Sequence, residues 1–173
     1  MLVLYVKDMT QKLKLEIERK WLLAGLPDMV SGIVPVEYER YFLPSNSGEE
    51  IRIQKKGNKR IYQRKVEVPG VGRERAEDRE IVEAEFLELK KTATGSILRT
   101  RYGLSPMVAI QVYHGEHEGL IRYEVEFQSV EEAQAFEPEP WVGREITNSP
   151  LGRDSRLLSM SRDEFEQEMK KHS

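Results

Sequence analysis

Acidic and basic side chains recur at every second position in two short segments of this chain. Glu16, Glu18 and Lys20 follow this spacing in the first segment, and Glu124 and Glu126 follow it in the second. Alternate residues of a β-strand point to the same face, so the glutamates of each pair would stand about 7 Å apart on one face. Carboxylate oxygens gathered in this way are ligands that Mg²⁺ and Mn²⁺ prefer.

Basic side chains occupy comparable positions in other alternating segments. Arg99 and Arg101 are in phase with each other, and Arg52 and Lys65 lie near the centres of two further segments. Arginine binds phosphate oxygens through a bidentate fork, and lysine binds them as a point charge. A dication among the carboxylates and a polyanion among the basic groups would explain both sets. An antiparallel sheet with one solvated face explains any single strand equally well, so the spacing alone leaves both interpretations open.

A sheet must position these side chains, because alternating segments bounded by turn residues dominate the chain. Capping boxes at Ser129 and Ser161 predict helices over 129–136 and 161–172, and a further helix is predicted over 83–91. The fold class is therefore α+β, with a mostly antiparallel sheet. The eight predicted strands cover residues 13–22, 38–43, 50–54, 60–68, 73–82, 96–102, 107–113 and 119–127.

Composition narrows the classes of function. Lysine and arginine number 27 and aspartate and glutamate 30, so the formal charge is −3 and gives no general attraction to nucleic acid or acidic membranes. There is no cysteine, which excludes disulfides, thiolate catalysis and cysteine-based metal sites. No apolar run approaches the roughly 20 residues of a membrane span. We expect a cytoplasmic protein with one domain over 1–173, in which residues 1–12 form a loose tail or an extra N-terminal strand.

The segment Glu16-Ile17-Glu18-Arg19-Lys20 resembles the ExExK signature of the CYTH superfamily, the triphosphate tunnel metalloenzymes. The other motifs of this superfamily follow in the expected order, so the resemblance covers roughly Leu13 to Arg156. They are Arg52, Lys65, Arg75-Ala76-Glu77, Arg99-Thr100-Arg101-Tyr102, Glu124-Val125-Glu126-Phe127 and Trp141-Val142-Gly143-Arg144-Glu145-Ile146-Thr147.

The resemblance implies an eight-stranded antiparallel β-barrel, the triphosphate tunnel, with helices packed outside. It implies metal-dependent hydrolysis of the terminal phosphoanhydride of a triphosphate, with inorganic tripolyphosphate as the first choice of substrate. Class IV adenylate cyclase activity, hydrolysis of thiamine or nucleoside triphosphates, and non-catalytic binding of polyphosphate or nucleotide are the alternatives. The expected partner is a small-molecule triphosphate, without membrane or nucleic acid, and the expected state is a monomer or homodimer.

The resemblance also assigns roles to residues. Glu16, Glu18 and Lys20 are expected to be catalytic, and Mg²⁺ or Mn²⁺ is the expected cofactor. Arg122 would join the phosphate ligands if its side chain turns inward. The expected metal ligands are Glu16, Glu18, Glu124, Glu126 and Glu77. The expected phosphate ligands are Lys20, Arg52, Lys65, Arg99 and Arg101.

Four features depart from the family pattern or leave it open, and one is the segment Gly152-Arg153-Asp154-Ser155-Arg156, which only loosely resembles the basic tail of the family. Gln111 stands where the family usually has an aspartate, and Gln54 replaces a common second arginine after Arg52. A neutral amide can coordinate a metal through its carbonyl oxygen but brings no charge. Residues 73–80 permit two strand registers, and a slip of one residue decides whether Glu77 faces inward.

Overall fold

One curled antiparallel sheet dominates the computed structural model, which describes residues 16–69 and 72–173. The strands run in the order β1-β8-β7-β6-β2-β3-β4-β5, and each predicted strand has its counterpart among them. The expected N-terminal segment 1–12 and the start of the first predicted strand lie outside the described residues. The strands are β1 (Ile17–Leu22), β2 (Val36–Leu43), β3 (Glu49–Lys56), β4 (Lys59–Val68), β5 (Gly72–Glu80), β6 (Gly95–Gly103), β7 (Val108–Tyr113) and β8 (Ile121–Phe127).

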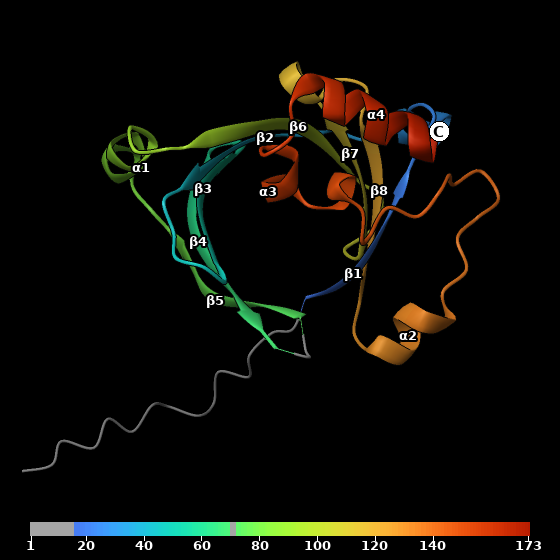
Figure 1. Cartoon of the computed structure of the whole chain (residues 1–173), viewed down its shortest axis with the longest axis horizontal. Coiled ribbons are helices and arrows are strands. Elements are labelled where there is room, and N and C mark those ends of the chain that lie inside the picture. The colour runs from blue at the N-terminus through green and yellow to red at the C-terminus, as the bar shows by residue number, and fades with distance from the viewer. Residues whose placement is uncertain (1–15, 70–71) are drawn as a thin grey trace, which may run out of the picture.

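The sheet curls until its two edge strands, β1 and β5, face each other, so that the strands form a ring when viewed end-on (Figure 1). Side chains bridge these edges, because Glu16 accepts hydrogen bonds from Lys65 of β4 and Arg75 of β5. The prediction of an eight-stranded antiparallel tunnel is therefore confirmed. Alternation places charged side chains on the inner face of the tunnel over most of its length.

A β-bulge between β4 and β5 resolves the two registers that the sequence permits. Arg64 lies opposite Glu77, but the next residue of β4, Lys65, lies opposite Arg75. The extra residue, Ala76, changes which parity of β5 faces inward. Arg75 therefore points into the tunnel from one side of the bulge and Asp78 from the other. The bulge places both a basic and an acidic side chain of β5 in the lining.

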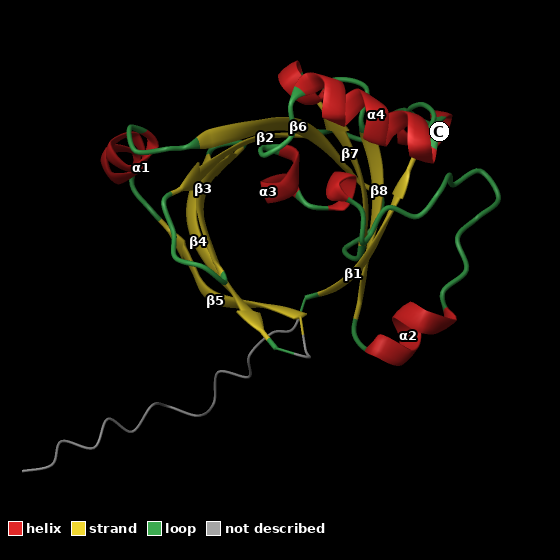
Figure 2. Cartoon of the chain, viewed as in Figure 1, coloured by secondary structure: helices red, strands yellow, loops and turns green. Residues whose placement is uncertain are grey.

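Two helices pack on the outer face of the sheet, as Figure 2 shows. Helix α1 (Glu83–Lys90) places Phe86 edge-on against Tyr41, with ring centroids 6.0 Å apart. Helix α2 (Val130–Ala135) begins at Ser129, whose side chain accepts a hydrogen bond from the backbone N–H of Glu132. The other short elements outside the tunnel wall are the 3-10 helices η1 (Asp28–Val30) and η2 (Gly115–His117).

The predicted helices lie outside the sheet (Figure 1), and the C-terminal part adds two short helical elements that the sequence did not predict. The 3-10 helix η3 (Pro150–Gly152) and helix α3 (Asp154–Leu157) enter the ring of strands (Figure 1). At this end of the tunnel the inner face is apolar, and its residues bury Leu151 and Leu157. Helix α4 (Arg162–His172), which starts with the predicted capping box at Ser161, adds Phe165 to the same cluster. The strand residues of the cluster are Leu22, Phe42, Ile97 and Tyr113, with Leu120 just before β8.

The segment before η3 covers part of the free edge of β1. The backbone N–H of Leu22 donates to the carbonyl of Arg144 (2.9 Å), and that of Ile146 donates to the carbonyl of Lys20 (2.8 Å). The Trp-Val-Gly-Arg-Glu-Ile-Thr motif therefore serves the sheet edge, and Trp141 packs edge-on against Tyr123 on the outer face. None of the helices in the two described ranges has the length and hydrophobicity of a membrane span.

Gly152 allows η3 to approach this segment closely, and we predict that Gly152→Ala destabilises the fold. A Cβ atom at Gly152 would lie 2.3 Å from the carbonyl oxygen of Ile146 and 2.7 Å from that of Thr147. Both oxygens belong to the backbone, so relief requires the chain to shift, at a cost of about 1–3 kcal/mol in the free energy of unfolding. Urea unfolding measures it, with Gly25→Ala as the control because that site is open. Equal midpoints for both variants would contradict the prediction.

Candidate active site

The tunnel contains a cavity of about 460 Å³ whose lining is strongly charged. Eleven lysine and arginine side chains and seven aspartate and glutamate side chains line it, an excess of four positive charges. The whole chain carries a formal charge of −3, so the positive charge is concentrated inside the tunnel. A cavity of this kind attracts a small, highly charged anion.

Nine of the ten residues predicted for the site line this one cavity. Glu77 is the exception and requires a correction. Its carboxylate lies on the outer face beside Arg79 (3.1 Å) and is 42% exposed, because Glu77 directly follows the bulged residue Ala76, where the parity of β5 changes. Asp78 is the carboxylate that β5 contributes instead. The residues that the cavity brings together are Glu16, Glu18, Lys20, Arg52, Lys65, Arg99, Arg101, Glu124 and Glu126.

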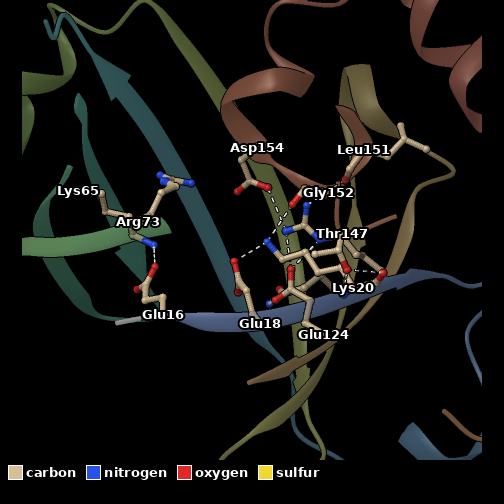
Figure 3. Close-up of polar contacts among 12 residues, drawn as sticks. Glu16, Glu18, Lys20, Lys65, Arg73, Glu124, Thr147, Leu151, Gly152 and Asp154 are labelled. Carbon is tan, nitrogen blue, oxygen red and sulfur yellow. Dashed lines mark hydrogen bonds and ion pairs between the residues drawn. The ribbon is translucent and has the colours of Figure 1, made fainter. Parts of the chain in front are cut away.

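Carboxylates concentrate where β1 pairs with β8. Glu18 lies directly opposite Glu126, and Glu124 is the next inward residue of β8. Like charges that face each other across a strand pair destabilise a sheet unless a cation lies between them. Lys20 meets part of this need, because its ammonium group donates to Glu18 (2.7 Å) and to the carbonyl of Gly152 (2.9 Å), as Figure 3 shows.

Gln111 supports the acidic side of the cavity from β7. Its amide nitrogen donates to Glu124 (3.0 Å), so its carbonyl oxygen must point the other way. That oxygen is buried and has no hydrogen-bond partner in the described part of the chain. Burial would raise the pKa of Glu124, but Arg122, Lys20 and other positive charges lower it to about 2. The site thus offers an ionised carboxylate, and the amide that holds it keeps one buried oxygen without a partner.

These donors fit a hard divalent cation. They are the carboxylate oxygens of Glu18, Glu124 and Glu126, and oxygen-only sites suit Mg²⁺ or Mn²⁺. Within residues 16–69 and 72–173, no three acidic or histidine side chains already converge as a metal site. The carboxylates are instead paired with cations, since Glu124 accepts from Arg122 at 2.6 Å. Binding of a metal would require these side chains to exchange an ion-pair partner for the ion.

Most basic groups in the cavity are already neutralised. Glu16 holds Lys65 and Arg75 (Figure 3 shows the first pair), which lowers the pKa of Glu16 to about 2 although burial alone would raise it. Arg52 donates to Glu50 (2.9 Å) and to the amide oxygen of Gln63 (2.9 Å). These ion pairs fix the side chains in place before any ligand enters.

Gln54 has a defined task in this network. Its amide oxygen accepts hydrogen bonds from Arg40, at 3.0 Å from Nη2 and 3.3 Å from Nε. An arginine at this position would bring a second positive charge against Arg40. The departure from the family pattern at Gln54 therefore accompanies a buried arginine on the neighbouring strand.

Arg99 and Arg101 of β6 line the cavity with few polar contacts to the rest of the described protein. Arg99 is 5% exposed, and its Nε–H has no partner in the described part of the chain. Its guanidinium lies over the ring of Tyr38, 5.1 Å from the centroid. Arg101 faces the same cavity, and no ion pair involves it within the described ranges. These two guanidiniums are available to an incoming anion.

Asp154 is the main site residue that sequence reasoning missed. Its carboxylate is buried inside the tunnel and contacts Arg40, Arg99, Arg122 and the hydroxyl of Tyr113. Residues 150–157 carry no periodic pattern, so no sequence signal placed them in the tunnel. Strand alternation could have found Arg40, which shares its parity with inward-facing neighbours on β2. Arg122 turns inward as anticipated, but its hydrogen bonds go to the protein itself.

The comparisons with known proteins agree with this geometry. No family model matches the chain. The chain is 34% identical over 147 residues to the inorganic triphosphatase of Nitrosomonas europaea. This alignment covers 82% of this chain and 95% of that protein. The solved structure of the inorganic triphosphatase NE1496 is similar, with a TM-score of 0.62 and 29% identity over 84% of this chain and 95% of that chain. A putative adenylyl cyclase from Hippeastrum, HpAC1, shares the fold at a TM-score of 0.50 and 13% identity, over 69% and 82% of the two chains.

Proposed function

The chain belongs to the CYTH superfamily of triphosphate tunnel metalloenzymes, and on this basis we propose that it hydrolyses the terminal phosphoanhydride bond of inorganic tripolyphosphate. The observation that carries the proposal is the cavity lining, with its excess of four positive charges and its separate acidic side. A tripolyphosphate anion matches the excess in charge. The acidic side supplies the oxygen ligands that a divalent cation needs.

Basic residues on two sides of the tunnel would bind the anion: β6 provides one side, and β3 and β4 provide the other. Arg99 and Arg101 of β6 bind phosphoryl oxygens, because their guanidiniums face the cavity with unused donors. Lys65 and Arg52 on the opposite wall add positive charge along the chain of the anion. In-line transfer to water depends mainly on such positioning and charge stabilisation. No nucleophilic side chain is required.

Glu18, Glu124 and Glu126 would hold the divalent ion, and Gln111 would orient Glu124 through its amide nitrogen. A bound divalent cation supplies charge neutralisation at the phosphoryl oxygens and a more acidic water. The low pKa of Glu124 suits it to holding positive charge rather than to accepting a proton. Water attacks the terminal phosphorus, the bond to the bridging oxygen breaks, and orthophosphate and pyrophosphate leave. We propose Mg²⁺ or Mn²⁺ as the divalent ion.

The lowered pKa of Lys65 predicts a loss of activity at alkaline pH. Burial lowers its pKa to about 8, and the charge of Arg52 acts in the same direction. Protonated Lys65 attracts phosphate, so kcat/KM should be full below pH 8 and fall as the pH rises through that value. Lys65→Arg keeps its charge at all these pH values and should move the decline to higher pH. A decline that stays near pH 8 in the variant would assign it to another group or to the substrate.

A second cavity of about 380 Å³ adjoins the tunnel cavity and bears on the choice of substrate. It shares Lys65 and Arg73 with the tunnel cavity, and Phe42 and Leu158 give it apolar walls. An organic group attached to a triphosphate would have room there, as the alternatives of cyclase and organic triphosphatase require. The test is a panel of tripolyphosphate, pyrophosphate, ATP and thiamine triphosphate with each metal, including a search for cyclic AMP. We expect tripolyphosphate to have the highest kcat/KM, and a higher value for ATP or thiamine triphosphate would overturn that choice of substrate.

The cytoplasmic location and the monomeric or homodimeric state remain predictions. Gel filtration with light scattering measures the second of these directly.

A further inference from the structure

Asp154 lies at the boundary between the charged and the apolar parts of the tunnel. It is 5% exposed and opens α3, whose Leu157 belongs to the apolar cluster. One carboxylate oxygen accepts hydrogen bonds from the hydroxyl of Tyr113 (2.6 Å) and from Arg122 (3.1 Å). The other oxygen accepts a hydrogen bond from Arg40. Arg99 approaches this second oxygen to 3.7 Å.

Three guanidiniums thus surround one buried carboxylate. Buried charges without partners are costly, and like charges repel strongly where water is excluded. Burial and the charges of Arg52 and Arg99 lower the pKa of Arg40 to about 9, and Asp154 opposes this effect. Burial would raise the pKa of Asp154, but the surrounding guanidiniums hold it well below its usual range. Asp154 is therefore ionised and supplies the counter-charge that lets the arginines share this space.

The three arginines are held to different degrees. Arg122 is fully engaged, since it also donates to Glu124 (2.6 Å) and to the carbonyl of Leu151 (3.2 Å). Arg40 is fixed between Asp154 and Gln54. Arg99 makes only one ion pair, the long contact to Asp154, beside its stacking on Tyr38, and it keeps an unpartnered Nε–H. Asp154 thus leaves one guanidinium facing the cavity with a free donor.

We propose that Asp154 is a positioning residue that acts as a resident anion: it occupies the place of an external anion among Arg40, Arg99 and Arg122, and so directs Arg99 toward the substrate. Without its charge, these arginines take up an anion from solution instead. The effect on Arg99 and turnover rests on the proposed function, because it is measured with tripolyphosphate as the substrate. The effect on anion binding stands apart from it.

The test is Asp154→Asn, which keeps the shape of the side chain and removes its charge. Its melting temperature in anion-poor buffer should fall, and sulfate or orthophosphate should restore it. The dissociation constant for sulfate, from thermal shift and calorimetry, should tighten at least about tenfold relative to wild type, which linkage reports as added stability. The kcat for tripolyphosphate should fall about 100-fold, because a displaced Arg99 misaligns the phosphoryl group.

Two further variants separate a positioning role from a structural one. Asp163→Asn makes the same chemical change at an exposed residue of α4 and should match wild type in every measurement. The double variant Arg40→Gln, Asp154→Asn removes one charge of each sign. It should recover stability in anion-poor buffer and lose most of the gained sulfate affinity. It also serves as the measured protein if the single variant does not fold, because it too lacks the resident anion and must show the loss of kcat.

Loss of stability in Asp154→Asn without rescue by sulfate or orthophosphate would overturn the proposal. So would an Asp154→Asn variant whose sulfate affinity and kcat equal those of wild type. If wild type itself does not hydrolyse tripolyphosphate, the proposed function fails. The anion-binding and melting measurements would still test Asp154 in that case.

Discussion

Glu124→Gln lowers kcat/KM for tripolyphosphate about 100- to 1000-fold, the loss typical when one electrostatic contact of a preorganised site is removed. Glu124 is ionised and inward-facing, and Gln111 and Arg122 fix its orientation. The substitution preserves volume but removes the charge that faces the expected cation. The concentration of Mg²⁺ or Mn²⁺ needed for half-maximal rate should rise as well. Initial rates of phosphate release over a metal titration measure both effects.

Glu77→Gln is the matched control for this variant. It makes the same chemical change on the outer face of the sheet, where the carboxylate pairs with Arg79. Its rate and metal requirement should match wild type. A loss of activity in Glu77→Gln as large as that in Glu124→Gln would contradict the assignment of the acidic side of the tunnel. Equal metal requirements in Glu124→Gln and wild type would contradict the role of Glu124 as a ligand.

Arg99→Ala reduces kcat/KM about 100-fold, because it removes a guanidinium that lines the cavity and has an unpartnered Nε–H. A factor of 100 corresponds to about 2.7 kcal/mol in the transition state, in the range of one charge-assisted, bidentate contact. Arg99→Lys should recover only part of the loss, since an ammonium group cannot reproduce the planar fork. Steady-state kinetics of the three proteins, with KM and kcat separated, measure the effect.

Arg64→Ala controls for the loss of an arginine from the sheet. Arg64 lies on β4 with its side chain on the outer face, where it pairs with Glu49. Its activity should remain within about twofold of wild type, and its stability should change little because exposed ion pairs contribute about 0–1 kcal/mol. Equal kinetic losses in Arg64→Ala and Arg99→Ala would show that the loss reflects damage to the sheet rather than to the site.

Strand alternation explains why so much of the site could be predicted from sequence. All charged residues of β6 and of β8 share one parity, and so do Glu18 and Lys20 of β1, so a correct strand assignment places them on one face. Closure of the sheet then brings Glu16 of one edge to Lys65 and Arg75 near the other. Alternation alone could not separate a closed tunnel from a solvated sheet. The ordered motifs of the superfamily made that distinction.

Two local features broke the alternation rule. At Ala76 the bulge reverses the parity of β5, which moves Glu77 outward and Asp78 inward. Bulges depend on pairing with the partner strand, and a single strand carries no clear sign of them. Near the C-terminus, Asp154 enters the tunnel from an aperiodic segment, where tertiary packing of Leu151 and Leu157 decides its position. The inward positions of Asp78 and Asp154 therefore follow from the folded structure and not from the sequence pattern.

The rate of orthophosphate release from tripolyphosphate by the wild-type protein, with Mg²⁺ or Mn²⁺ and then with excess chelator, tests the central claim most directly. We predict one orthophosphate and one pyrophosphate for each tripolyphosphate consumed, with activity abolished by the chelator and restored by added metal. Tight binding of tripolyphosphate in calorimetry without any turnover, in either metal, would contradict the account and identify a binding protein instead.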